Sequence, residues 1–178
     1  MSKKVGENMR QSIDTVQLGA AISAVGTILS AIAATPNQSI PDTIQDDFEF
    51  IGNILEALGT AVASEEDATA LIRTGEILEI IGNIEVAAST LTDNRKLQKL
   101  LNKQGGLLQI VGGAVTLPYG EQLSRNEVIA TIGSILDIIG NTIQVLVDDT
   151  TEQGIMWNAI GGWIQAVGAV IVVIAVEN

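Results

Sequence analysis

One octapeptide pattern constrains the fold of this chain more than any other feature. It is framed by two glycines seven residues apart and carries a polar residue at its fifth position. Its six copies are Gly19–Gly26, Gly52–Gly59, Gly75–Gly82, Gly105–Gly112, Gly133–Gly140 and Gly161–Gly168. Because the spacing is kept in every copy, the pattern predicts a repeated structural unit.

The seven-residue spacing favours a helix over a strand. On a strand, two glycines seven residues apart would point to opposite faces. On a helix, seven residues make nearly two turns, so both glycines fall on one stripe. At about 100° per residue, the polar fifth position lies beside that stripe, and the apolar third, fourth, sixth and seventh positions fill the remaining arc. We therefore predict six helices, each with a glycine groove, a narrow polar strip and a broad apolar face.

The framing glycines need a compensating role, because glycine inside a helix costs up to about 1 kcal/mol relative to alanine. Small residues allow the backbone of a neighbouring helix to approach closely. The alternative is that the glycines are drift in a low-complexity sequence. We predict that the framing glycines are helix-packing or assembly sites: Gly19, Gly26, Gly52, Gly59, Gly75, Gly82, Gly105, Gly112, Gly133, Gly140, Gly161 and Gly168.

Prolines, polar turns and capping patterns divide the chain into helices. The capping box that begins at Ser124 is the clearest helix start, and Pro118 lies in the clearest break. The β-branched run at 169–174 leaves a buried C-terminal strand as an alternative. Within a single helical-repeat domain spanning 1–178, we predict helices over about 5–34, 42–63, 65–91, 94–117, 125–147 and 151–176. The octapeptides of helices three and four resemble those of helices five and six, so the fold class expected is an all-α, antiparallel six-helix bundle built from helical hairpins.

Composition excludes several classes of function. The net charge of −12 disfavours nucleic acid and anionic lipid surfaces as partners. The chain has neither cysteine nor histidine, which removes disulfides, thiol chemistry, and the commonest general base and metal ligand. We therefore expect a protein that is not an enzyme, with no catalytic residues, no cofactor and no metal site.

The polar fifth positions are candidate site residues. They would either converge inside a bundle or face water or a neighbouring subunit, and we favour the second arrangement. These residues are Ser23, Glu56, Glu79, Gln109, Asp137 and Gln165. Whether the acids Glu56, Glu79 and Asp137 bind cations stays open at this point.

Two further groups of residues have two interpretations each. Arg95, Lys96, Lys99 and Lys103 form a basic stripe, which is either a solvated face or a dock for the acidic face of a neighbouring copy. Trp157 and Trp163 are expected to fill a core or an interface, and the alternative is anchoring at a membrane surface.

Two functions fit this pattern. The first is a non-enzymatic structural protein whose partner is itself, and which self-assembles into a filament, a sheet or another homo-oligomer through glycine-striped helices. The second is a membrane-active, pore-forming or inserting protein, because the helices at 5–34 and 151–176 contain uncharged runs long enough to span a bilayer. We find no convincing signal peptide and expect cytoplasmic synthesis.

The texture of the repeats also carries a resemblance. The sequence Gly-Asn-Ile-Leu-Glu-Ala-Leu-Gly at 52–59 and the Ile-Ile-Gly-Asn tetrapeptides resemble short, repetitive, uncharacterised helical proteins of spore-forming Gram-positive bacteria. The resemblance extends along most of the chain. It implies no activity, and it points to an assembly in the mother cell or the spore.

Overall fold

The computed structural model of the chain describes residues 2–37, 39–65, 68–118, 122–148 and 150–177, with side chains described from Thr15 to Val176. It contains the helices α1 (Ser2–Ala34), α2 (Asp42–Ala63), α3 (Ala70–Ser89), α4 (Arg95–Thr116), α5 (Arg125–Leu146) and α6 (Glu152–Glu177). The described residues form no strand, so the prediction of an all-α fold is confirmed. The alternative of a C-terminal strand at 169–174 is wrong, because α6 continues through these residues.

Side-chain caps fix the starts of α4 and α5, as they do that of α3. The Asn94 side chain accepts hydrogen bonds from the N–H groups of Lys96 and Leu97 at the start of α4. At the start of α5, Ser124 and Glu127 form both hydrogen bonds of the predicted capping box. These bonds satisfy N–H groups that the first turn of a helix leaves without partners.

The third helix differs from its predicted range of 65–91, because it begins at Ala70 and ends at Ser89. Thr69 is its N-cap, and the hydroxyl oxygen of Thr69 accepts a hydrogen bond from the N–H of Ile72 at 3.3 Å. Ser64, just before the predicted start at 65, follows the end of α2, and its hydroxyl donates to the carbonyl oxygen of Thr60. Residues 66 and 67 of the predicted start lie outside the described part of the chain.

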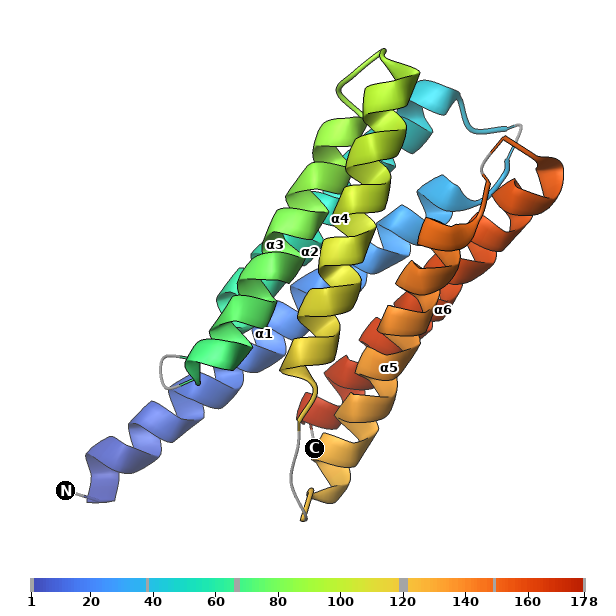
Figure 1. Cartoon of the computed structure of the whole chain (residues 1–178). Coiled ribbons are helices and arrows are strands. Elements are labelled where there is room, and N and C mark those ends of the chain that lie inside the picture. The colour runs from blue at the N-terminus through green and yellow to red at the C-terminus, as the bar shows by residue number, and fades with distance from the viewer. Residues whose placement is uncertain (1, 38, 66–67, 119–121, 149, 178) are drawn as a thin grey trace.

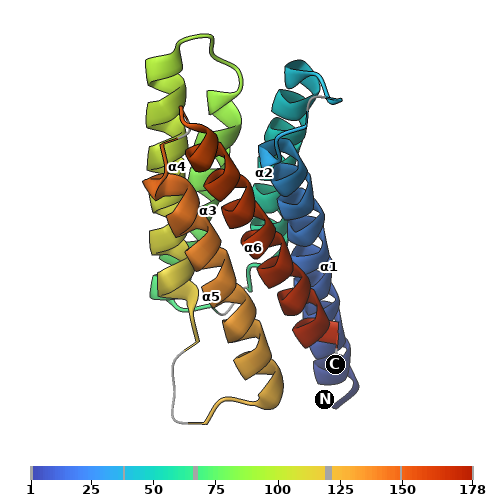
Figure 2. The same cartoon turned by 90° about the vertical axis from the view of Figure 1, so that its right-hand side faces the viewer.

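Each helix contacts its neighbours in the chain and α6 contacts α1, so the six helices form a closed ring, which Figures 1 and 2 show from two sides. The most extensive contacts lie within the pairs α1–α2, α3–α4 and α5–α6, and smaller contacts join α2 to α3, α4 to α5 and α6 to α1. In the described part of the chain, no other pair of helices has Cα atoms within 8 Å. The interior of the ring is therefore occupied by side chains and not by contacts between helix backbones.

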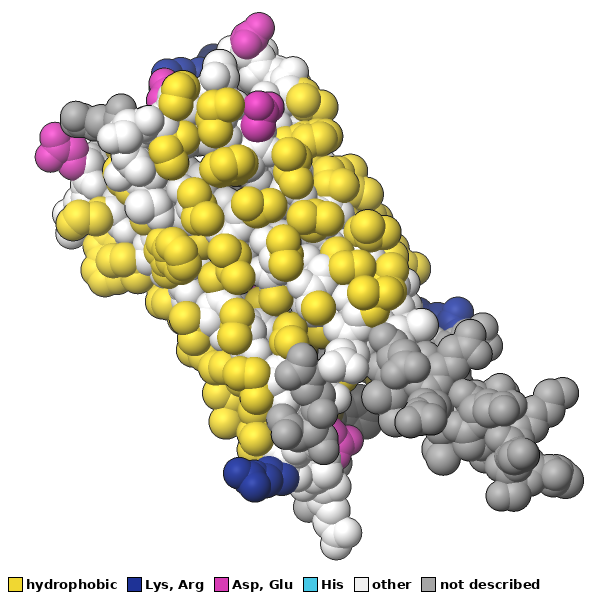
Figure 3. Space-filling view, turned by 180° about the vertical axis from the view of Figure 1, so that it is seen from behind, with side chains coloured by type: hydrophobic (Ala, Val, Ile, Leu, Met, Phe, Trp, Pro, Cys, Tyr) yellow, Lys and Arg dark blue, Asp and Glu magenta, His cyan; other side chains and the backbone are white. Residues whose placement is uncertain are grey.

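The distribution of side chains is the inverse of that in a water-soluble protein: many large apolar side chains are exposed, and polar side chains are buried. All the buried hydrophobic residues of the bundle, as far as the structure describes them, are alanines, whereas Asn53, Asn83, Gln109, Asn141 and Gln165 are buried polar residues. Exposed large aliphatic side chains occur on all six helices, and on the side seen in Figure 3 hydrophobic side chains cover the middle while charged groups lie near the ends. The seventh position of every octapeptide is an exposed aliphatic residue: Val25, Leu58, Ile81, Val111, Ile139 and Val167.

A polar cavity along the axis of the bundle

Each framing glycine faces a glycine of the adjoining helix. A Cβ atom added to Gly82 would lie 2.5 Å from the carbonyl oxygen of Gly105, and one added to Gly140 would lie 2.5 Å from that of Gly161. Carbon and oxygen atoms that are not bonded do not approach so closely. The facing pairs are Gly19–Gly59, Gly26–Gly52, Gly75–Gly112, Gly82–Gly105, Gly133–Gly168 and Gly140–Gly161. All twelve glycines therefore contact another part of the same chain.

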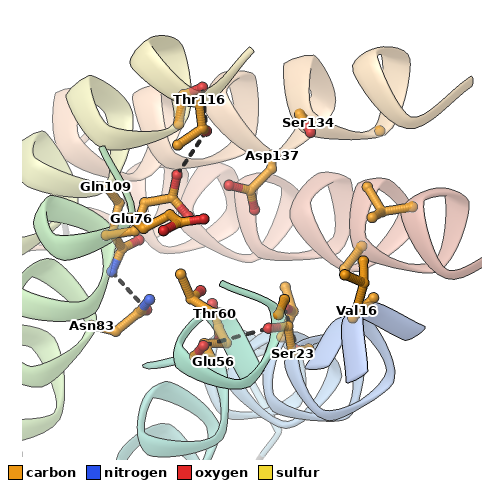
Figure 4. A pocket seen from close by; sticks show the side chains of 18 of the residues that line it. Val16, Ser23, Glu56, Thr60, Glu76, Asn83, Gln109, Thr116, Ser134 and Asp137 are labelled. Carbon is orange, nitrogen blue, oxygen red and sulfur yellow. Dashed lines mark hydrogen bonds between the residues drawn. The ribbon is translucent and has the colours of Figure 1, made fainter. Parts of the chain in front are cut away.

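Two consecutive cavities occupy the interior, with volumes of about 320 Å³ and about 280 Å³. Residues from all six helices line each cavity, and Glu56 and Gln109 line both, so the two cavities meet at these residues. Ser23 and Asp137 line the first cavity (Figure 4). Glu79 also lines the first cavity, and Gln165 lines the second. The six fifth-position residues thus all face the interior, and not the water or neighbouring subunit that we favoured from the sequence.

The three fifth-position acids lie near one another in the interior. Each is half-buried and accepts a hydrogen bond from a polar side chain within the bundle. The bonds run from Ser30 Oγ to Glu56 Oε1 (2.9 Å), from Thr116 Oγ1 to Glu79 Oε1 (3.1 Å) and from Asn141 Nδ2 to Asp137 Oδ2 (3.4 Å). Asp137 also repels Glu56 and Glu79 electrostatically. The described residues contain no group of three acids placed to hold a metal ion together.

The second cavity is rich in carboxamides. Gln109 Nε2 donates to Asn83 Oδ1 at 2.9 Å, and Gln165 Nε2 donates to Gln144 Oε1 at 2.6 Å, so buried amides are paired across neighbouring helices. Amides offer both donors and acceptors to water or a solute. The amide residues that line this cavity are Asn53, Gln98, Asn102, Gln109, Asn141, Gln144, Asn158 and Gln165.

The basic stripe of α4 is divided between the cavity and the surface. Lys99 and Lys103 line the second cavity, although Lys103 is exposed like Arg95 and Lys96, and only Lys99 is half-buried. The Lys99 ammonium lies 4.0 Å from the carboxylate of Asp148, in the connection between α5 and α6. The hydroxyl and N–H groups of Thr150 donate hydrogen bonds to the Asp148 carboxylate, and these bonds hold the pKa of Asp148 below its usual value. This carboxylate therefore stays ionised beside the lysines.

The two tryptophans are not in the core. Trp157 and Trp163 on α6 are both close to half exposed. The indole Nε1 of Trp163 donates to the hydroxyl of Thr35 at 2.9 Å, just beyond the end of α1. This bond adds to the contact by which α6 and α1 close the ring.

Two further acids line the interior, although neither is at a fifth position of the octapeptide. Glu49 lines the second cavity and Glu76 the first. Glu49 lies seven residues before Glu56, so both fall on one stripe of α2. That spacing was a usable signal, but Glu49 lies outside the octapeptides. Glu76 has no comparable signal, because the second position of the other copies holds alanine, asparagine, glycine or serine.

The fold and the two cavities define a helical bundle with acids and amides along its interior and an aliphatic outer face. The chain belongs to a family of unknown function (DUF6944), whose model matches residues 14–173. No curated protein and no solved structure matches the chain. The family match carries no link to spore-forming bacteria, so that part of the resemblance stays a prediction.

Proposed function

We propose that this protein is a non-enzymatic membrane protein: a six-helix bundle of antiparallel hairpins that encloses a polar lumen within the bilayer. The observation that carries the proposal is the inverted distribution of side chains. Exposed aliphatic residues occur on all six helices, and acids and amides line the interior. In water such an exterior would be a large unfavourable apolar surface, whereas lipid chains solvate it.

Helix lengths support a position across the bilayer. The helices α2, α4 and α5 have 22 residues each. At about 1.5 Å per residue they are about 33 Å long, close to the roughly 30 Å hydrocarbon core of a membrane. By length and composition alone, Thr15–Ala34, Arg125–Leu146 and Glu152–Val176 qualify as membrane spans in the described chain.

The charged residues of the helices are compatible with this position. Ionisable side chains within membrane helices face the bundle interior or a water-filled cavity. Glu56, Glu79 and Asp137, in the middle of their helices, line the lumen. The basic residues of α4 lie in its first nine residues, near one end of the bundle. Trp157, near the start of α6, suits the membrane–water boundary.

The glycine contacts support close packing of the helix pairs in lipid. Between membrane helices the hydrophobic effect contributes little, so tight packing at small residues and interhelical hydrogen bonds drive association. The facing glycines supply such packing, and the Gln109–Asn83 bond joins α4 to α3. We propose the framing glycines as packing sites within each hairpin.

Flotation with lipid tests the proposal. The protein is purified in detergent, reconstituted into liposomes, washed with alkaline carbonate and centrifuged through a density gradient. We expect it to float with the lipid after the wash, because its aliphatic exterior is embedded in the bilayer. Recovery at the bottom of the gradient, or release by carbonate, would contradict membrane insertion.

A self-assembling structural protein is the second candidate. The same exposed aliphatic surface favours it, because copies of the chain could cover this surface in water. The framing glycines face one another within the chain, so contacts between copies would use the aliphatic residues. Assembly in the mother cell or the spore belongs to this candidate. Lipid-free polymers in negative-stain micrographs, together with failure to float, would favour it over the membrane protein.

A further inference from the structure

We propose that the lumen conducts small monovalent cations and rejects anions. This inference rests on the proposed membrane-embedded bundle and adds the class of solute. Three observations support it: the acids that line both cavities, the carboxylate of Glu49, which has no partner among the described residues, and the placement of the other acids on different helices.

Acids line the lumen over both of its cavities. Glu49 lines the second cavity, Glu56 lies where the two cavities meet, and Glu76, Glu79 and Asp137 line the first. No lysine or arginine is among the described residues that line the first cavity. Rings and rows of carboxylates in a low-dielectric pore attract cations and repel anions.

Basic residues occur only at one end of the lined interior, as far as the chain is described. Lys99 and Lys103 line the second cavity, and Lys99 lies beside the carboxylate of Asp148. Both lysines lie in the first half of α4, toward the connection between α5 and α6. The second cavity has two acids and two lysines in its lining, whereas the described lining of the first cavity has four acids and no basic residue, so the first cavity is the part of the lumen that would select for cations.

Glu49 points to a ligand that is separate from the protein. Its half-buried side chain lines the second cavity, and none of the described residues forms a hydrogen bond or an ion pair with its carboxylate. A carboxylate in such a place is unfavourable without a compensating charge. A cation in the cavity would supply that charge.

The described acids do not form a group of three that could hold a metal ion, which favours monovalent cations in transit over a tightly held metal ion. Glu56, Glu79 and Asp137 lie on three different helices, and each accepts a hydrogen bond from its own donor. Conduction requires several weak sites in sequence, since a single strong site would retain the ion. Hydroxyl and amide oxygens between the acids, such as those of Ser23 and Gln109, offer further neutral ligands.

Reversal potentials in planar bilayers under a KCl gradient test the inference. We expect the wild-type current to reverse near the equilibrium potential of K⁺ and not that of Cl⁻. Asp137→Asn and Glu56→Gln keep the side-chain shape and remove the charge, so each should move the reversal potential toward zero. Asp93→Asn, at an exposed acid outside the lumen, is the matched control and should leave it unchanged.

The wild-type measurement keeps the inference testable even if a lumen variant fails to fold. Protein that floats with liposomes but passes no current, or reverses at zero or near the Cl⁻ potential, would overturn cation conduction and leave the membrane bundle intact. Equal shifts in Asp137→Asn and Asp93→Asn would also overturn it. Failure of the wild type to float would instead reject the proposed function.

Discussion

Gly112 and Gly113 are adjacent on α4, but only Gly112 packs against the backbone of another helix. A Cβ added to Gly112 would lie 2.6 Å from the carbonyl oxygen of Gly75 and 2.9 Å from the N atom of Glu79. A Cβ added to Gly113 would meet no backbone, and its nearest neighbour would be the Ile138 side chain at 3.2 Å. Backbone cannot move without separating α3 from α4, whereas an isoleucine side chain can adjust.

The corresponding prediction compares Gly112→Ala with Gly113→Ala. Gly112→Ala should lower the free energy of unfolding by about 1–3 kcal/mol, the usual range for an overpacked contact. Gly113→Ala should be neutral or stabilising by up to about 1 kcal/mol, because alanine favours the helix. Denaturant titration in detergent micelles, followed by circular dichroism, measures both. Equal losses in the two variants would show that the contact between facing glycines does not determine packing.

Within one helix, the positions of the octapeptide lie in three different environments. The framing glycines contact the partner helix, the fifth residue lines the interior, and the seventh residue is exposed. The sequence predicts the helices and the separate polar and apolar faces, because these follow from the angle per residue. It does not predict which face points inward, because that depends on how all six helices close. The sequence also does not predict that α3 begins as late as Ala70, because it contains both Ser64 and Thr69 as possible N-cap residues, and only Thr69 has that position in the structure.

The contact between α1 and α6, which closes the ring, can be tested with an engineered disulfide. A Cβ added to Gly162 would lie 3.6 Å from the Cβ of Ala31, within the range that disulfides require. The double variant Ala31→Cys/Gly162→Cys should therefore form an intramolecular disulfide on mild oxidation. The chain has no cysteine of its own to compete. Intact mass and non-reducing electrophoresis detect the bond.

A control pair places the second cysteine elsewhere on α6. Val170 is exposed on the outer face, so Ala31→Cys/Val170→Cys should remain reduced or link two molecules. If Ala31→Cys/Gly162→Cys gave only intermolecular links, α1 and α6 would not be neighbours within one chain, and the ring would be open.

At the scale of the whole molecule, the polar lumen exists because contacts distant in the sequence close the ring. The Trp163–Thr35 hydrogen bond joins residues 128 positions apart, and no local pattern predicts it. The fifth-position residues were therefore identifiable as candidates from the sequence, but their convergence on one cavity was not. The periodicity of the sequence also does not predict what covers the apolar exterior, because both lipid and a second copy of the chain can pack against an aliphatic surface.

The most direct test of the membrane-embedded bundle uses two neighbouring residues of α5 in liposomes. Ser134 lines the first cavity, and Ile135 is exposed on the outer face. In single-cysteine variants, a small water-soluble methanethiosulfonate reagent should modify Ser134→Cys through the lumen and leave Ile135→Cys unmodified in lipid. Both cysteines should react once detergent and denaturant unfold the protein. Rapid modification of Ile135→Cys in intact proteoliposomes, with Ser134→Cys protected, would contradict a polar lumen surrounded by lipid.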